Sequence, residues 1–170
     1  MLQAAVEAAK SKDVVFIFAG LPDSFESEGF DRSHMQLPKS QTRLIEEVVR
    51  RNSNVCVILY AGSPVEMPWI AQVKAVLMAY LPGQEGAASI ANILYGQVNP
   101  SGKLAETFPI KLSDNPSYLH FGEKRQTLYS ESIFVGYRYF ETVPENFTYD
   151  REEALQDYES VEKIIRAYKE

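Results

Sequence analysis

Cysteine and histidine are scarce in this sequence, which limits the metal chemistry it can support. The chain has one cysteine and two histidines in 170 residues. A single cysteine excludes an intrachain disulfide and a cysteine zinc cluster, and two histidines alone do not make a histidine-rich metal site. Cys56 lies inside an apolar run at residues 55–59, so we expect a buried structural thiol rather than a nucleophile.

Positive charge and long apolar runs are also lacking. The chain has 17 lysine and arginine residues against 23 acidic residues. Its net charge of -6 does not favour binding to DNA or RNA. No apolar run has the length that spans a bilayer, so no membrane partner is expected. The glycine motifs of nucleotide-binding loops and the G-x-S-x-G motif of serine hydrolases are absent. We therefore expect no metal, no cofactor, no nucleic acid and no serine nucleophile.

Short continuous apolar runs alternate with helical patterns along most of the chain. Strands are predicted at residues 14–19, 55–60, 75–80 and 106–108, and helices at residues 4–10, 42–50 and 87–95. Continuous apolar strands that alternate with helices are typical of a parallel sheet covered on both faces, so the fold class is α/β. Further on, residues 133–140 indicate an added strand or a loop packed on the core, and residues 151–170 indicate a charged amphipathic helix.

The loop at residues 20–34 is long and contains two nearby acids, Glu26 and Glu28. It follows the first predicted strand, where α/β proteins place their ligands, and long ordered loops are uncommon unless they are functional. Two close carboxylates are compatible with general acid/base chemistry, and also with a solvated acidic loop. Asp31 and Arg32 either pair to hold this loop, or Arg32 binds hydroxyls or carboxylates of a ligand.

Several motifs follow one another in a specific order between residues 14 and 141. They are residues 26–32 with 35–38 and Gln41, residues 62–69, residues 80–86 continuing to 94–96, residues 99–104 with 107–109, and residues 129–139. Together they resemble the C-terminal α/β-sandwich domain of glycoside hydrolase family 3, the β-glucosidase family. The resemblance implies a three-layer α/β/α sandwich with a mostly parallel sheet of the six-stranded type.

The resemblance also implies a role for the acidic loop. Members of this family are retaining glycosidases whose aspartate nucleophile lies in a separate (β/α)8 barrel domain, and the sandwich domain supplies the acid/base glutamate. Glu28 matches that glutamate, and Glu26 is its rival because loop lengths vary here. Asp31 and Arg32 would hold the loop or contact substrate. The expected partners are a β-linked glycoside and the barrel, and the chain alone is expected to be inactive.

The chain departs from the family pattern at two places. It contains no barrel and no nucleophile motif, so we expect a fragment of a larger enzyme. Residues 1–141 are predicted to form the sandwich domain. Where the family usually continues toward a final β-sandwich, residues 142–170 instead indicate a charged helical tail, to which no role is assigned. The alternative function is a non-catalytic domain that binds a small ligand or a carbohydrate with the same loop. The sequence does not choose among sugars or linkages.

Overall fold

The computed structural model describes residues 1–122, 125, 127–129 and 131–142. In chain order the elements are α1 (Leu2–Ala9), β1 (Val15–Gly20), α2 (Lys39–Val49), β2 (Val55–Tyr60), the 3-10 helix η1 (Ile70–Gln72), β3 (Ala75–Met78), α3 (Gly86–Leu94), the 3-10 helix η2 (Leu112–Asp114) and α4 (Tyr137–Thr142). In this part of the chain, no helix combines the length and the apolar character needed to cross a bilayer.

The strands form one parallel sheet in the order β1-β2-β3. Val15 pairs with Val55 at the start of β1, and Gly20 pairs with Tyr60 at its end. Strand β2 is central, and its apolar side chains are buried between two layers, as expected for a parallel sheet. Because all strands run the same way, the loops that follow β1 and β2 leave from the same edge of the sheet.

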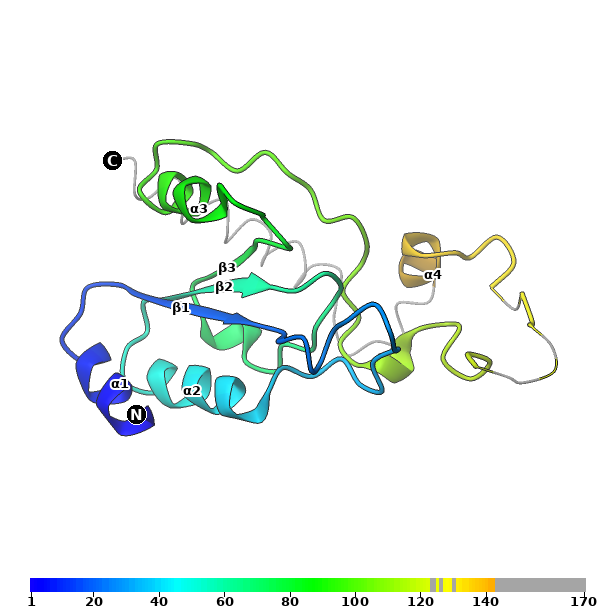
Figure 1. Ribbon diagram of the computed structural model, residues 1–170, viewed down its shortest axis with the longest axis horizontal. Coiled ribbons are helices and arrows are strands. Elements are labelled where there is room, and N and C mark those ends of the chain that lie inside the picture. Colours follow the sequence, from blue (N-terminus) through cyan, green and yellow to red (C-terminus); the bar gives the residue numbers. More distant parts are fainter. Residues whose placement is uncertain (123–124, 126, 130, 143–170) are drawn as a thin grey trace.

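Helices cover the sheet on opposite sides, so the architecture is a three-layer α/β/α sandwich. Figure 1 shows α1 and α2 on one face and α3 on the other. Ile45 and Val48, three residues apart on α2, are buried against the sheet residues of the main core. Ile90 on α3 and Ile58 on β2 are buried outside that core, on the second face.

The second face of β1 is largely uncovered. The side chains of Phe16 and Phe18 are 42% and 57% exposed. The alternating residues Ile17 and Ala19 point to the other face and are buried in the main core. The ring of Phe18 stacks on Tyr60 of the neighbouring strand at a centroid distance of 6.3 Å. Cys56 lies on the same face, and burial raises the pKa of its thiol to about 11. The environment of Cys56 therefore supports a structural role for its thiol.

Most of the predicted elements are confirmed, within three residues at their ends. β2 has the predicted bounds, and α2 begins at Lys39, directly after Pro38, whose fixed backbone suits a helix start. The described sheet has three strands, so the six-stranded count is not confirmed.

Two predictions about extended segments are wrong. Residues 106–108 form no strand, because this short Glu-Thr-Phe segment pairs with no strand among the described residues. Residues 133–140 form neither a strand nor a packed loop: Tyr137–Thr142 is the helix α4, none of whose residues is buried. The predicted helix at residues 151–170 lies outside the described residues, and the predicted boundary between residues 141 and 142 stays a prediction.

Candidate active site

The candidate site is built by two loops that leave neighbouring strands at the same edge of the sheet. Residues 21–34 follow β1, and residues 61–69 follow β2. The start of the first loop is held by Gln41 of α2, whose side-chain amide bonds both backbone groups of Gly20. Gln41 Oε1 accepts from Gly20 N at 2.8 Å, and Gln41 Nε2 donates to Gly20 O at 2.9 Å. The last residue of β1 is thereby fixed to the helix beside it.

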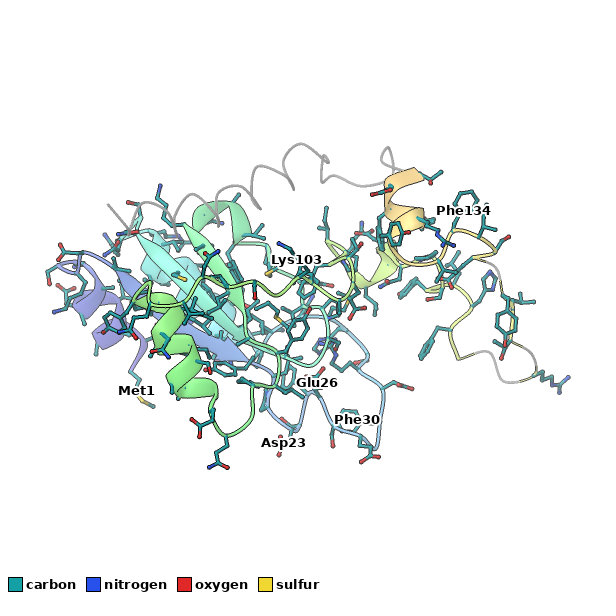
Figure 2. The ribbon with its side chains drawn as sticks, turned by 90° about the horizontal axis from the view of Figure 1, so that it is seen from above. Met1, Asp23, Glu26, Phe30, Lys103 and Phe134 are labelled. Atoms are coloured by element: carbon teal, nitrogen blue, oxygen red, sulfur yellow. The ribbon has the colours of Figure 1, made fainter. Side chains whose placement is uncertain are left out.

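Glu26 is bound to the second loop through both of its carboxylate oxygens. Oε2 accepts a hydrogen bond from the backbone N–H of Gly62, and Oε1 accepts one from the hydroxyl of Ser63, each at 2.7 Å. The side chain is half-buried rather than solvated. Figure 2 shows Glu26 on the loop that extends from the sheet edge to Phe30. Hydrogen bonds to an ionised carboxylate are among the stronger kinds, so Glu26 ties the two loops together.

Arg32 bonds the same serine from the other end of the first loop. Its Nη2 donates to Ser63 Oγ at 2.6 Å and to the carbonyl oxygen of Pro64 at 2.9 Å. The other terminal nitrogen, Nη1, is buried and meets no acceptor in the described part of the chain. Glu26, Ser63 and Arg32 therefore form one hydrogen-bonded cluster, which we call the loop clamp.

Glu28 lies at the tip of a turn between the two clamped positions. Ser27 and Phe30 pair as an isolated antiparallel bridge, so Glu28 and Gly29 are the two residues that close the turn. The Glu28 side chain is exposed, and among the described residues its carboxylate has neither a hydrogen bond nor an ion pair. The two glutamates thus differ sharply: Glu26 is bonded to the protein, and Glu28 is presented to the outside.

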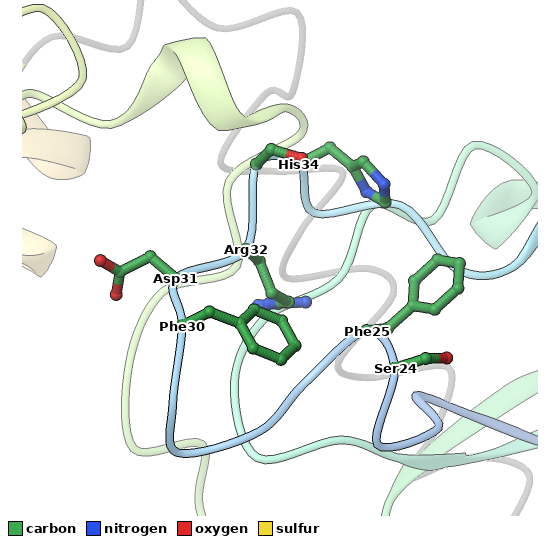
Figure 3. A pocket seen from close by; sticks show the side chains of 7 residues that line it. Ser24, Phe25, Phe30, Asp31, Arg32 and His34 are labelled. Atoms are coloured by element: carbon green, nitrogen blue, oxygen red, sulfur yellow. The ribbon is translucent and has the colours of Figure 1, made fainter.

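A small pocket adjoins this turn. Its volume is about 180 Å³, and it is lined by Ser24, Phe25, Phe30, Asp31, Arg32, Ser33 and His34 (Figure 3). The rings of Phe25 and His34 meet edge to face at a centroid distance of 5.7 Å. The carboxylate of Asp31 points away from the Arg32 guanidinium in Figure 3, and no ion pair joins these two residues.

No role for Ser63 in this site was predicted from the sequence. Residues 62–69 were considered there only as part of a family motif. A signal was present, because Ser63 follows a strand that is parallel to and paired with β1, and both loops leave from one edge. Gln41 was likewise part of a motif with no assigned contact.

Fold and site together define a parallel α/β domain that presents a carboxylate from a clamped loop. The family model described as the glycosyl hydrolase family 3 C-terminal domain matches residues 1–137. The thermostable β-glucosidase B of Acetivibrio thermocellus is 59% identical over 143 residues, which are 84% of this chain and 19% of that protein. The chain therefore belongs to glycosyl hydrolase family 3, as its C-terminal domain.

Solved structures agree with this assignment. The β-glucosidase of Kluyveromyces marxianus in complex with glucose superposes with a TM-score of 0.81 at 38% identity, over 88% of this chain and 18% of that one. The family 3 β-glucosidase of Bifidobacterium adolescentis gives a TM-score of 0.79 at 42% identity, over 84% of this chain and 22% of that one. The chain thus spans about a fifth of the proteins that it matches.

Proposed function

We propose that this domain supplies the acid/base carboxylate of a retaining β-glycosidase whose nucleophile belongs to a (β/α)8 barrel domain of the same protein. The substrates would be glycosides with terminal non-reducing β-D-glycosyl residues, as the names of the related β-glucosidases suggest. The observation that carries the proposal is the presentation of Glu28, exposed and unpaired within the described residues, at the tip of a turn whose two flanks are bonded to the protein.

The contacts favour Glu28 over Glu26 as the acid/base. A general acid must come within hydrogen-bond reach of the oxygen that it protonates. Both oxygens of Glu26 already accept hydrogen bonds from Gly62 and Ser63, and these bonds hold the carboxylate against the second loop. The carboxylate of Glu28 has no such ties in the described structure and can be approached from outside.

In this mechanism Glu28 acts twice. It first protonates the glycosidic oxygen as the leaving group departs, and a covalent glycosyl-enzyme forms on the nucleophile. It then removes a proton from the water that hydrolyses this intermediate. Retaining glycosidases hold their two carboxyl groups about 5–5.5 Å apart, so the barrel carboxylate would have to approach the tip of the 27–30 turn closely. An exposed tip is suited to that arrangement.

The test is Glu28→Gln in a protein that joins this chain to a barrel. The host is the full-length protein, or a chimera with this chain in place of the matching segment of the 59% identical β-glucosidase B. We expect kcat/KM for an alkyl β-glucoside to fall about 100-fold or more, with a much smaller loss for an aryl glucoside whose leaving group needs no proton. Added azide should raise the turnover of that activated substrate and give the glycosyl azide. Equal, small losses on both substrates would contradict the proposal.

A ligand-binding domain without a catalytic residue is the second candidate. The pocket beside the turn favours it, because Phe25 and Phe30 offer apolar surface and the buried Nη1 of Arg32 lacks an acceptor among the described residues. On this reading Glu28→Gln would leave the leaving-group dependence of catalysis unchanged, and a pocket substitution such as Phe30→Ala would weaken ligand binding.

A further inference from the structure

We propose that the loop clamp of Glu26, Ser63 and Arg32 is a positioning device that fixes where Glu28 meets the substrate. The inference rests on the proposed function, since it assigns a task to three residues relative to the acid/base. None of the three would touch the reacting atoms, so they are positioning residues rather than catalytic ones.

The clamp holds the acidic loop on both sides of the turn that carries Glu28. Glu26 precedes the 27–30 turn and Arg32 follows it, and both bond one hydroxyl, that of Ser63. Residues 27 to 31, between the two anchors, are all exposed. A segment with so little buried surface has little else to order it, because local stability follows buried contacts. The direction in which Glu28 projects therefore depends on its two anchored ends.

The shared partner of the two side chains is a hydroxyl group, whose chemistry suits both of them. A serine hydroxyl has one donor and can also accept, so it can connect a cation to a carboxylate. Here Arg32 Nη2 donates to Ser63 Oγ at 2.6 Å, and Ser63 Oγ donates to Glu26 Oε1 at 2.7 Å. An alanine at this position could do neither, and both charged side chains would lose their common partner. The bonds of Glu26 to Gly62 N and of Arg32 to Pro64 O would remain.

The clamp is anchored on the sheet. Ser63 follows β2, the central strand, whose residues 57–59 are fully buried. Misplacing a catalytic group by about 1 Å can cost on the order of 100-fold in rate, so a rigid reference for an exposed turn has a direct catalytic value. The clamp transmits the position of β2 to the loop that follows β1.

The experiment replaces Ser63 in the same barrel-containing protein, with Ser63→Ala as the disrupting variant and Ser63→Thr as the conservative one. We expect Ser63→Ala to lower kcat/KM for an alkyl β-glucoside by about 10- to 100-fold and for an activated aryl glucoside by less than about 3-fold. Ser63→Thr keeps the hydroxyl and should recover most of the loss. The exposed Ser89 of α3 provides the control, and Ser89→Ala should match the parent on both substrates.

The leaving-group dependence separates positioning from a merely structural role. A variant that only unfolds part of the protein would lose activity equally on both substrates, and that result would overturn the inference. If Ser63→Ala does not fold, Glu26→Gln serves instead, because it keeps the shape of the side chain and should show the same selective loss. Hydrogen exchange of residues 24–34 should be faster in either variant than in the parent.

Failure of this inference can be told apart from failure of the proposed function. If Glu28→Gln shows the acid/base signature with azide rescue while Ser63→Ala and Glu26→Gln behave like the parent, the clamp is rejected and the function stands. If Glu28→Gln behaves like the parent on both substrates, the function itself is rejected. If Glu26→Gln, and not Glu28→Gln, shows azide rescue, Glu26 is the acid/base and the positioning role is overturned.

Discussion

The hydroxyl of Ser63 donates a hydrogen bond to the carboxylate of Glu26 at 2.7 Å across a separation of 37 residues in the chain. This contact exists because β1 and β2 are adjacent and parallel, so their following loops emerge side by side. The contact distinguishes the two glutamates of the acidic loop: Glu26 joins the two loops, and Glu28 is exposed and has no hydrogen bond or ion pair among the described residues.

The first prediction is that the 170-residue chain alone does not hydrolyse an aryl β-glucoside. A retaining glycosidase needs two carboxyl groups at a short separation, and the proposed acid/base is only one of them. The measurement is release of the aryl group by the purified chain, compared with the barrel-containing protein at equal molarity. Turnover by the chain at a rate similar to that of the larger protein would contradict the prediction.

Much of the fold could be predicted from local patterns, because the relevant signals are local. The apolar run of β2 can be recognised within a short stretch of sequence. The same holds for the helical spacing of Ile45 and Val48 on α2. The strand predicted at residues 106–108 was wrong because a strand forms only beside a neighbouring strand. Local propensity does not supply that neighbour.

The site was predictable only in part. The family resemblance pointed to Glu28 with Glu26 as rival, but nothing in the spacing of the two residues separates their environments. The difference comes from Gly62 and Ser63, more than 30 residues away, so no local pattern contains it. Whether Glu28 is the acid/base, and whether Asp31 contacts substrate, stay predictions.

The second prediction concerns the close approach of β1 and β2 at the entrance to the site. A Cβ on Gly20 would lie 2.3 Å from the carbonyl oxygen of Tyr60 and 2.8 Å from its Cβ. Gly20→Ala must therefore push the strand ends apart, and we expect a loss of about 1–3 kcal/mol in the free energy of unfolding. The measurement is denaturant unfolding of the barrel-containing protein followed at this domain.

Gly29 is the matched control for that substitution. It lies in the 27–30 turn, a Cβ there would meet nothing within 4 Å, and its φ is not positive. Gly29→Ala should thus change stability by less than about 0.5 kcal/mol. If both alanine variants were equally destabilised, the predicted clash at Gly20 would not be the cause.

The third prediction is that Cys56 resists alkylation in the folded protein below about pH 9. Burial raises the pKa of its thiol from 9.0 to about 11. At pH 9 the folded state would hold roughly 1% thiolate, whereas the unfolded chain would hold about half. The measurement is the rate of iodoacetamide labelling of the Cys56 peptide by mass spectrometry, with and without denaturant.

The same shift makes stability depend on pH. The folded-state pKa is above the unfolded value, so this contribution is fully present below pH 9 and is lost as the pH rises through 9 toward 11. Cys56→Ser would remove this dependence, since serine does not ionise in that range. Labelling of native Cys56 at pH 8 as fast as in denaturant would contradict the buried position of the thiol.

The last prediction is that Gln41 stabilises the start of the acidic loop through both backbone groups of Gly20. Gln41→Met keeps a similar length but removes both hydrogen bonds, and leaves an N–H and a carbonyl in a half-buried place without their partner. We expect a loss of about 1–3 kcal/mol in the free energy of unfolding and faster hydrogen exchange in residues 20–26.

The control is Gln84→Met at an exposed position before α3, which should change neither measurement. Because the side chain of Gln41 bonds Gly20, the last residue of β1, and not the clamp residues, its loss should loosen the base of the loop while the clamp at Ser63 persists. Equal exchange rates in the Gln41→Met and parent proteins would show that the clamp alone orders the loop.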